Sequence, residues 1–533
     1  MHMRPSMTNG LLTILPAIVI TGAMIASGAN RTDEVADEIR RPMIALTDVI
    51  DVIDEEEGRR DEHPTGASGA PLALRKRSAR IVPETLPHEA GPGATLAWAP
   101  FSDLSLVATV VRRVDRGERG YTLSGEVGEH GRGWFVLSVH HPVVVGVFND
   151  GEGRQVELRP AGANGDRFNI TEVDPAAYGG CGVCEGRPSP VNDSLFPQRD
   201  SQARPAARRP DGRTSSGTNA GTNAGTNMAT GDGTSDGCEF GPDDGSIIDV
   251  MVVWTPAARA SAGGVKAMEA LVEAAVESTN LAYTNSGIAP EIRLVYKGEV
   301  DYRESGSMNT DLVNLRQQNE VMPEVHTIRQ EVGADLVALL THGSGLCGLG
   351  YVLTTLESDF APFAFSVTRW QCAVGNLSFA HELGHNMGCG HDHQNVLPSL
   401  FDDSFGHRWT GDRGTLWRSI MALQPGERVP HFSNPEIDFD GQPTGVAEGF
   451  PEPANHARTI NESACYVANF MPSVDSEPAC PADLTGDGTV NVFDLLQLLD
   501  LWGACESCSA DLTGDGVVDV FDLLTLLAAW GPC

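Results

Sequence analysis

Apolar and polar residues alternate along the first ordered part of the chain. Five segments between residues 105 and 160 alternate in this way and are separated by turn residues: SLVATVVRRV, YTLSGEV, GWFVLSV, PVVVGVF and RQVELRP. Period-2 alternation with turn residues between the segments predicts a small β-rich domain. Residues 30–62 instead have the spacing of an acidic amphipathic helix followed by a charged loop.

A different pattern begins at residue 247, where the continuous apolar run IIDVMVVWT predicts a buried strand. Helical spacing follows over 265–284 and 323–332, and further strand-like segments cover 291–300, 334–341, 346–353 and 363–370. Strands that alternate with helices predict an α/β fold on a twisted mixed sheet, mostly parallel. We expect this unit to span residues 244–472.

Two segments do not resemble folded domains. Residues 1–29 combine a positive start at Arg4, an apolar run and the small residues Ser27-Gly28-Ala29, which predicts a signal peptide cleaved after Ala29. The alternative is a membrane anchor, for which the run is short. Residues 188–240 are rich in Pro, Arg, Ser, Gly and Thr, and predict a disordered linker where proteases cut.

Charge and cysteine content narrow the class of protein. The 533 residues carry a formal net charge of −35. This charge disfavours nucleic acid and anionic membranes as partners. Eleven cysteines suit an oxidising compartment, and their odd number leaves at least one thiol outside intramolecular disulfides. We therefore expect a secreted protein without a membrane span in its mature form.

The strongest chemical signal is HELGHNMGCGHD at residues 381–392. His381 and His385 are four residues apart, so on a helix both imidazoles project from one face and can bind one zinc ion. Glu382 can reach a water on the zinc without being a ligand. Gly388 can end the helix so that His391 returns as a third ligand. Three protein ligands leave the fourth position open, as in catalytic zinc sites.

This motif resembles the metzincin signature, in which a methionine turn lies beneath the zinc. Met421 in RSIMA has the position of that turn, and Asp392 with the segment VPHFSNP resembles the reprolysin (adamalysin) branch, especially its bacterial members. The resemblance covers about 244–472. It implies the three histidines as zinc ligands and Glu382 as the general base that takes a proton from a zinc-activated water. A peptide substrate would lie extended along an edge strand near residues 346–353.

Cys181 lies in a Cys-Gly-Val stretch before the predicted linker. Secreted metzincins often carry a cysteine in such a stretch of their propeptide, where its thiolate fills the open zinc position. The resemblance implies that residues 30–187 are a propeptide with Cys181 as a zinc latch. A disulfide from Cys181 to Cys184 or to Cys238 is the alternative.

Four further cysteines and one further histidine lie within residues 244–472. For the four cysteines of the catalytic unit we favour the pairs Cys347–Cys372 and Cys389–Cys465 among three connectivities. His393 follows Asp392, and we expect it to be a solvated loop histidine rather than a ligand.

Residues 479–533 are an internal duplication with a period of 28. Two twelve-residue loops, DLTGDGTVNVFD and DLTGDGVVDVFD, place oxygens at the positions of an EF-hand calcium loop. The expected calcium ligands of the first loop are Asp483, Thr485, Asp487, Thr489 (carbonyl), Asn491 and Asp494. Those of the second loop are Asp511, Thr513, Asp515, Val517 (carbonyl), Asp519 and Asp522.

The duplication resembles a type I dockerin, with one short helix after each loop. That resemblance implies two Ca²⁺ ions and a cohesin-like partner. Docking would use Val492, Phe493, Val520 and Phe521, and the alternative is that these side chains close a small core. The four cysteines of this small module are expected to form disulfides within or across the repeats; they are Cys480, Cys505, Cys508 and Cys533.

Together these features predict a secreted zinc-dependent endopeptidase, made as a zymogen and docked through its tail. One alternative is a non-proteolytic adhesion or scaffold protein that acts through the dockerin-like module. The intact Glu382 argues against it. A third hypothesis keeps the zinc chemistry but hydrolyses another amide.

Overall fold

The computed structural model describes residues 43–46, 50–54, 72–81, 90–128, 130–162, 167–182, 241, 243–317, 321–343, 345–356, 358–474, 482–485, 489–504, 508–513 and 516–532. The expected signal peptide over residues 1–29 and the expected linker over residues 188–240 lie outside the described residues.

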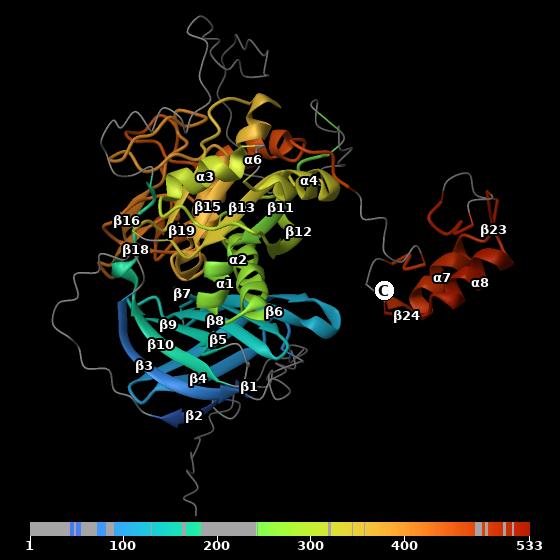
Figure 1. Ribbon diagram of the computed structural model, residues 1–533, viewed down its shortest axis with the longest axis horizontal. Coiled ribbons are helices and arrows are strands. Elements are labelled where there is room, and N and C mark those ends of the chain that lie inside the picture. The colour runs from blue at the N-terminus through green and yellow to red at the C-terminus, as the bar shows by residue number, and fades with distance from the viewer. Residues whose placement is uncertain are drawn as a thin grey trace, which may run out of the picture. The chain divides into compact units, whose positions relative to one another are not determined.

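The N-terminal region is a ten-stranded sheet with the strand order β1-β4-β5-β6-β7-β8-β9-β10-β3-β2 (Figure 1). Its strands are β1 (Met43–Ala45), β2 (Ile50–Asp54), β3 (Leu72–Ile81), β4 (Thr95–Phe101), β5 (Leu104–Asp115), β6 (Gly120–Val127), β7 (Gly133–His140), β8 (Val143–Asn149), β9 (Gln155–Pro160) and β10 (Phe168–Asp174). The β-rich prediction is confirmed.

The amphipathic helix expected within residues 30–62 is wrong where the structure describes that segment. Residues 43–45 pair in parallel with β4, and residues 50–54 pair with β3. Backbone pairing with neighbouring strands overrides the helical spacing of the sequence, because propensity is only a weak prior against tertiary contacts.

The catalytic unit is built on a five-stranded sheet of order β12-β11-β13-β15-β14. Its strands are β11 (Ile247–Trp254), β12 (Glu291–Glu299), β13 (Leu336–Thr341), β14 (Gly348–Gly350) and β15 (Phe365–Arg369). All pairs are parallel except β14 with β15. The sheet is therefore mixed, as expected, and the short strand β14 forms its edge nearest the histidine motif.

Six helices accompany this sheet. They are α1 (Pro256–Ala262), α2 (Val265–Asn285), α3 (Met308–Arg316), α4 (Pro323–Val332), α5 (Ser378–Asn386) and α6 (His456–Val467). The sequence pattern predicted α2 and α4, and the spacing of His381 and His385 predicted α5. It missed α6, and it missed α1 and α3, which begin with Thr255 and Ser307 as capping residues.

Helix α2 contacts both sheets. It packs on β12 and α5 of the catalytic unit and on β6, β7 and β8 of the N-terminal sheet (Figure 1). Almost the whole helix is buried, and residues of both sheets share one hydrophobic core. The N-terminal region thus covers a helix face that would otherwise be open to water.

Two buried glutamates of α2 form the polar part of this contact. Ser124 donates a hydrogen bond of 2.6 Å to Glu277. His140 lies 3.3 Å from Glu273, which is also paired with Lys297. Burial works to raise the pKa of Glu273, but the bond from His140 and the charges of Arg116 and Lys297 lower it to about 2. Glu273 is therefore ionised and paired inside the protein.

The remaining elements of the catalytic unit are short strands around the histidine motif. A three-stranded sheet joins β16 (Arg408–Thr410), β17 (Leu416–Arg418) and β18 (Glu427–Arg428). A hairpin joins β19 (Asp438–Phe439) and β20 (Gln442–Pro443).

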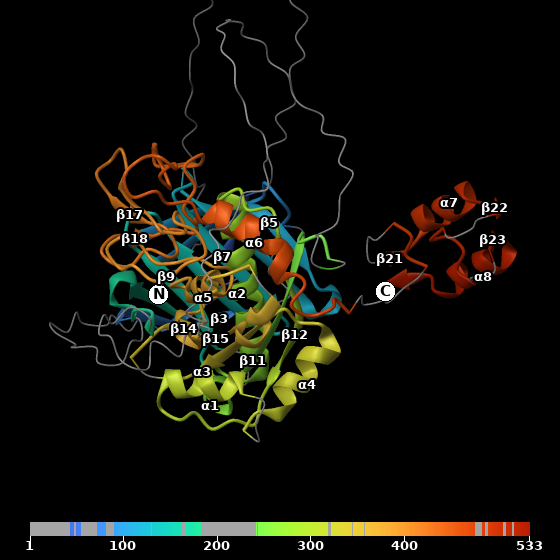
Figure 2. The same cartoon turned by 90° about the horizontal axis from the view of Figure 1, so that it is seen from above.

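The tail is described here by itself. Helices α7 (Val492–Asp500) and α8 (Val520–Ala528) lie side by side (Figure 2). Two small antiparallel pairs accompany them, β21 (Thr489–Val490) with β24 (Gly531–Pro532), and β22 (Gly503–Ala504) with β23 (Val517–Val518). The core is a symmetric set contributed by both repeats: Ala482, Val490, Leu498, Ala510, Val518 and Leu526.

The residues after each loop point away from this core. Phe493 is 63% exposed and Phe521 is 61% exposed, and Val492 and Val520 are exposed as well. These four side chains therefore do not close a core, and their expected role in docking stays a prediction. Among the described residues no helix is long and apolar enough to cross a membrane.

Candidate metal centre

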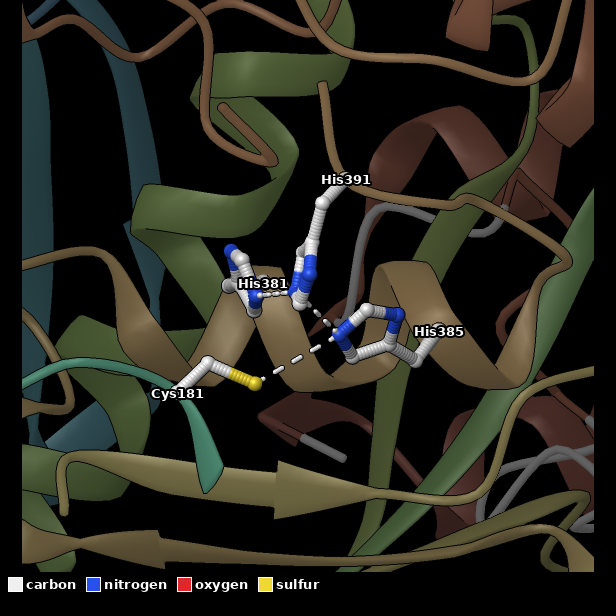
Figure 3. A group of neighbouring side chains, drawn as sticks. All are labelled: Cys181, His381, His385 and His391. Atoms are coloured by element: carbon white, nitrogen blue, oxygen red, sulfur yellow. Dashed lines mark hydrogen bonds between the residues drawn. The ribbon is translucent and has the colours of Figure 1, made fainter. Parts of the chain in front are cut away.

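Helix α5 brings the first two histidines and the glutamate together. His381, Glu382 and His385 are all buried on this helix. Gly388 follows with a φ of 95°, a left-handed conformation in which a side chain is strained. The chain turns there, and His391 comes back beside the helix (Figure 3).

The three imidazoles converge through their Nε2 atoms. Nε2 of His391 lies 3.2 Å from Nε2 of His381 and 3.1 Å from Nε2 of His385. Nitrogen ligands at about 2.0–2.1 Å from a tetrahedral zinc ion are separated by about 3.3–3.4 Å. The observed spacing therefore fits one zinc ion.

Two of these rings are oriented by backbone carbonyl groups. Nδ1 of His381 donates to the carbonyl oxygen of Ile420, and Nδ1 of His385 donates to that of Cys389, both at 2.9 Å. A ring that donates from Nδ1 presents a lone pair at Nε2. Burial lowers the pKa of each of the three histidines, that of His385 to about 4, so they are neutral at pH 7.

The thiol of Cys181 completes a four-residue cluster. Its Sγ lies 3.6 Å from Nε2 of His385, and the four ligand atoms of the cluster all lie within 4.8 Å of one another (Figure 3). With a zinc–sulfur distance of about 2.3 Å, a tetrahedral site separates sulfur from nitrogen by about 3.6 Å. Cys181 is buried, and its sulfur is a thiol rather than part of a disulfide.

The segment around Cys181 crosses from one side of the centre to the other. The backbone N–H of Cys347 donates to the carbonyl oxygen of Gly180 at 2.8 Å, and Cys181 forms a parallel bridge with Gly348 of β14. On the other side, Gln424 donates to the carbonyl oxygen of Ala176 at 2.9 Å. The N-terminal region therefore occupies the strip beside the edge strand.

Glu382 packs against this edge strand. A side chain at Gly348 would place its Cβ 2.6 Å from Cγ and 2.5 Å from Cδ of Glu382. Among the residues that the structure describes, no donor meets Oε1 of Glu382. Burial and the neighbouring Cys181 thiol raise the pKa of Glu382 well above its usual range, against the charge of Arg428.

Met421, the residue expected at the methionine turn, packs against helix α5. A Cβ on Gly384 of α5 would come 2.7 Å from Sδ of Met421, so the sulfur lies directly against the helix that carries the histidines. Asp392 pairs with Arg408 at 2.8 Å and accepts from the backbone N–H of Leu423 at 2.9 Å. Asp392 thus links the loop of the third histidine to the loop after the turn.

Three other expectations concern this region. Cys347 and Cys372 form the predicted disulfide. The pair Cys389–Cys465 is wrong, because Cys389 is a buried free cysteine and Cys465 is bonded elsewhere. His393 stays outside the histidine cluster; its ring nitrogen Nε2 lies 2.8 Å from the carbonyl oxygen of Pro453.

The structure describes only part of the expected calcium loops. Asp487 and Asp515 lie outside the described residues. In the first loop Asp494 accepts from the backbone N–H and the hydroxyl of Thr485, both at 2.8 Å, and Asp522 is held in the same way in the second loop.

The same two aspartates also cap the helices. Asn491 and Asp494 form a capping box at the start of α7, and Asp519 and Asp522 form one at the start of α8. The last residue of each loop therefore serves the helix as well as the loop. Thr489, Asp483, Asp511, Thr513 and Val517 lie in the described parts of the loops.

Sequence reasoning missed two residues of the centre. Gly348 adjoins Glu382, and its only sequence signal is the small-residue stretch CGLG in a predicted strand. Arg428 donates from Nη1 to the carbonyl oxygen of Asn376 at 2.7 Å, two residues before α5 begins. Burial lowers the pKa of His381 and His391, and the charges of His385 and then Arg428 act in the same direction. Nothing in the local sequence pattern distinguishes Arg428.

Comparison with known proteins agrees with this geometry. A family model for metallopeptidase family M12, reprolysin type, matches residues 244–433. A peptidyl-Asp metalloendopeptidase of Stenotrophomonas maltophilia (strain R551-3) is 34% identical over 229 residues, which are 42% of this chain and 52% of that protein. One of Pseudomonas aeruginosa PAO1 is 29% identical over 252 residues, covering 42% and 40% respectively.

The chain spans about half the length of the curated relatives it matches. A solved metalloproteinase-II of Bacteroides fragilis is 10% identical, covers 58% of this chain and 85% of its own, and has a TM-score of 0.31. The family match and the histidine cluster together support a metallopeptidase domain over residues 244–433.

Proposed function

We propose that this chain is a secreted zinc endopeptidase of the metzincin type, made in a latent form. The observation that carries the proposal is the convergence of three neutral, buried histidine nitrogens at tetrahedral spacing, with Glu382 beside them. The M12 family match supports it independently.

The residues of the centre would have separate roles in hydrolysis. Zinc held by the three histidines would polarise the peptide carbonyl and make a water more acidic. With zinc bound, Glu382 would serve as the base that accepts a proton from water and as the acid that returns it to the leaving amine. Its raised pKa in a buried position suits a group that must both accept and return a proton. The edge strand β14 offers backbone groups to an extended substrate.

The names of the relatives suggest the substrate. Both the Stenotrophomonas and the Pseudomonas proteins are peptidyl-Asp metalloendopeptidases. We extend this preference to the present chain and propose that it hydrolyses peptide bonds beside aspartate.

The latency is proposed from the position of Cys181. Its sulfur has the place of a fourth zinc ligand, and the segment from Ala176 to Gly182 covers the strip where a substrate would lie. A thiolate on zinc excludes the water that the reaction needs. Removal of the N-terminal region by cleavage within residues 188–240 would then activate the enzyme.

The tail is proposed to be a calcium-binding docking module of the dockerin type. The exposed apolar faces of α7 and α8 support a binding role, because a soluble protein rarely leaves such side chains uncovered without one. A cohesin-like protein would be the partner.

The test uses the full chain, loaded with zinc and treated with trypsin, which cleaves after the arginines of the predicted linker. After trypsin is inhibited, casein hydrolysis is measured for the wild type and for Glu382→Gln. The account predicts hydrolysis by the wild type, loss of at least about a hundredfold in the variant, and loss on chelation of the metal.

Latency is tested by measuring casein hydrolysis of variants that have not been treated with trypsin. Cys181→Ala should raise casein hydrolysis above that of the untreated wild type. Cys389→Ala, which removes a buried thiol outside the histidine cluster, should leave the untreated chain latent. If the treated, zinc-loaded wild type hydrolyses nothing, the endopeptidase proposal fails, and the non-proteolytic scaffold becomes the better hypothesis.

A further inference from the structure

The segment that carries Cys181 has two buried side chains. Residues 175–182 have the sequence PAAYGGCG, and within them the side chains of Tyr178 and Cys181 are buried, each 6% exposed. Glycines precede and follow the thiol, and glycine loses more conformational freedom on ordering than any other residue. A thiol on such a segment needs a nearby anchor to stay at the metal, and Tyr178 lies three residues before it.

The ring of Tyr178 packs on the catalytic unit. It belongs to a small buried cluster with Val173, Cys347 and Cys372. The two cysteines form the disulfide that joins the start of β14 to the turn after β15. A Cβ added to Gly375 would come 2.2 Å from the hydroxyl oxygen of Tyr178. The tyrosine therefore fills a site that stays open only because residue 375 has no side chain.

The hydroxyl of Tyr178 is held by the N-terminal sheet. Gln155 of β9 donates to it from Nε2 at 2.9 Å, and the hydroxyl donates to the carboxylate of Glu157. Glu157 also accepts from Nε of Arg159 at 2.8 Å, and that guanidinium lies 5.2 Å from the ring centre of Trp370. Burial raises the pKa of Tyr178 well above its usual range, so the hydroxyl keeps the proton that it donates. Tyr178 is thus clamped between β9 and the catalytic unit.

Other contacts of the segment use its backbone. The carbonyl oxygens of Ala176 and Gly180 accept hydrogen bonds from the catalytic unit, and a segment of another sequence would offer the same atoms. These bonds place the segment in the cleft, but they do not determine which of its residues faces the three imidazoles. A side chain must set that register, and Tyr178 is the buried one beside the thiol.

We propose that Tyr178 is the positioning residue of the latch: its clamped side chain fixes the register of residues 176–182 and so holds the Cys181 thiol at the open zinc position. The inference rests on the proposed latent form and names the residue on which latency depends. Without the clamp the thiol would hang on a flexible tether. It would then leave the metal more often, because a flexible tether lowers its effective concentration there.

The test measures how often the thiol leaves the metal. The full chain, loaded with zinc and not treated with trypsin, is exposed to iodoacetamide, and mass spectrometry follows the alkylation of Cys181 and Cys389. A thiolate on zinc is protected, so the alkylation rate of Cys181 follows the fraction of chains with an open latch. Cys389 is a buried thiol outside the histidine cluster, so its alkylation reports a general loosening of the fold. Casein hydrolysis by the same chain is the second measurement.

Two variants disturb the clamp from opposite sides. Tyr178→Phe removes the hydroxyl from the N-terminal region, and Gly375→Ala places a methyl group where that hydroxyl lies. Each should raise Cys181 alkylation and casein hydrolysis at least about tenfold over the untreated wild type, the effect of one lost hydrogen bond to a charged group. Cys389 should stay protected in both.

Tyr121→Phe is the matched control. It removes another buried tyrosine hydroxyl of the N-terminal sheet, one that meets no hydrogen-bond partner among the described residues. Both rates should keep their wild-type values in this variant. After trypsin treatment the clamp is gone, so Gly375→Ala should then hydrolyse casein within about twofold of the treated wild type. If Gly375→Ala is inactive in both states, the substitution damages the catalytic unit, and Tyr178→Phe decides alone.

The outcomes separate this inference from the proposed function. Wild-type alkylation of Cys181 in Tyr178→Phe and Gly375→Ala overturns the inference, and so does alkylation of Cys389 as fast as that of Cys181. If Cys181→Ala activates the untreated chain and these two variants do not, the latch exists but other contacts position it. A treated wild type that hydrolyses nothing overturns the proposed function instead. If Tyr178→Phe does not fold, Gly375→Ala, which leaves the N-terminal region unchanged, decides.

Discussion

Gly348→Ala tests whether the edge strand positions the general base. The added Cβ would lie 2.6 Å from Cγ of Glu382 and 2.5 Å from its Cδ. Carbon atoms in ordinary contact are about 3.5–4.0 Å apart, so the Glu382 side chain must shift by about 1 Å. The three histidines do not share this contact, so the site should still bind one zinc ion per chain.

A shift of about 1 Å in a reacting group can reduce the rate about a hundredfold. We therefore expect kcat to fall by about that factor, equivalent to about 2.7 kcal/mol in the activation free energy. KM should change little, because β14 keeps its backbone. Gly350→Ala is the matched control on the same strand. Its Cβ would lie 3.1 Å from the backbone oxygen and 3.4 Å from Oε2 of Glu382, so kcat should stay within about fivefold of the wild type.

The assay measures kcat and KM on a neutral fluorescent peptide with the trypsin-treated full chain, and zinc content by mass spectrometry. If the Gly348→Ala variant retains zinc and its kcat stays within about threefold of the wild-type value, the edge strand does not position Glu382. Equal losses in the Gly348 and Gly350 variants would lead to the same conclusion, since the two predicted displacements differ.

Three further predictions concern stability and the tail. Glu273→Gln should lower the free energy of unfolding of the full chain by about 3 kcal/mol at pH 7, because the pKa of Glu273 is lowered to about 2 from 4.5. That contribution is present above pH 4.5 and is lost as pH falls toward 2, so equal urea-unfolding losses at pH 7 and pH 3 would contradict it. Replacing both Cys347 and Cys372 by serine should lower the free energy of unfolding by about 3.5 kcal/mol, because the disulfide closes a loop with a sequence separation of 25. Urea unfolding measures this loss, and an unchanged free energy of unfolding would contradict the prediction. Calcium titration should show two binding sites in the wild type and none in the double variant Asp494→Ala, Asp522→Ala. A wild-type chain that binds no calcium would contradict the proposal that the tail is a calcium-binding module.

Sequence reasoning placed the metal centre because its signal is local. A spacing of four residues on a helix fixes the relation of His381 and His385, and the positive φ of Gly388 explains how His391 returns. Met421 and Cys181 were placed from family resemblance. Their contacts with the centre span 37 residues or more of sequence, and no periodicity could have supplied them.

Some contacts of the centre and some strands depend on tertiary structure, so the sequence pattern could not predict them. Gly348 has no motif, and its contact with Glu382 arises only because β14 packs against α5. The short strands β1 and β2 were read as helical because their sequence spacing allows a helix, and pairing with β4 and β3 settles the matter. The pairing of Cys389 with Cys465 follows only from the number of cysteines in this unit. In the structure Cys389, which lies between His385 and His391 in the sequence, is a buried thiol of the hydrophobic core.

The most direct test of the account is X-ray absorption at the zinc edge of the full chain, before and after trypsin treatment. The account predicts one zinc with three imidazole nitrogens at about 2.0–2.1 Å and one sulfur at about 2.3 Å in the untreated chain. Activation should replace the sulfur by a light atom. A site without three imidazoles would contradict the zinc centre. A site with three imidazoles but no sulfur before activation would contradict the latch formed by Cys181.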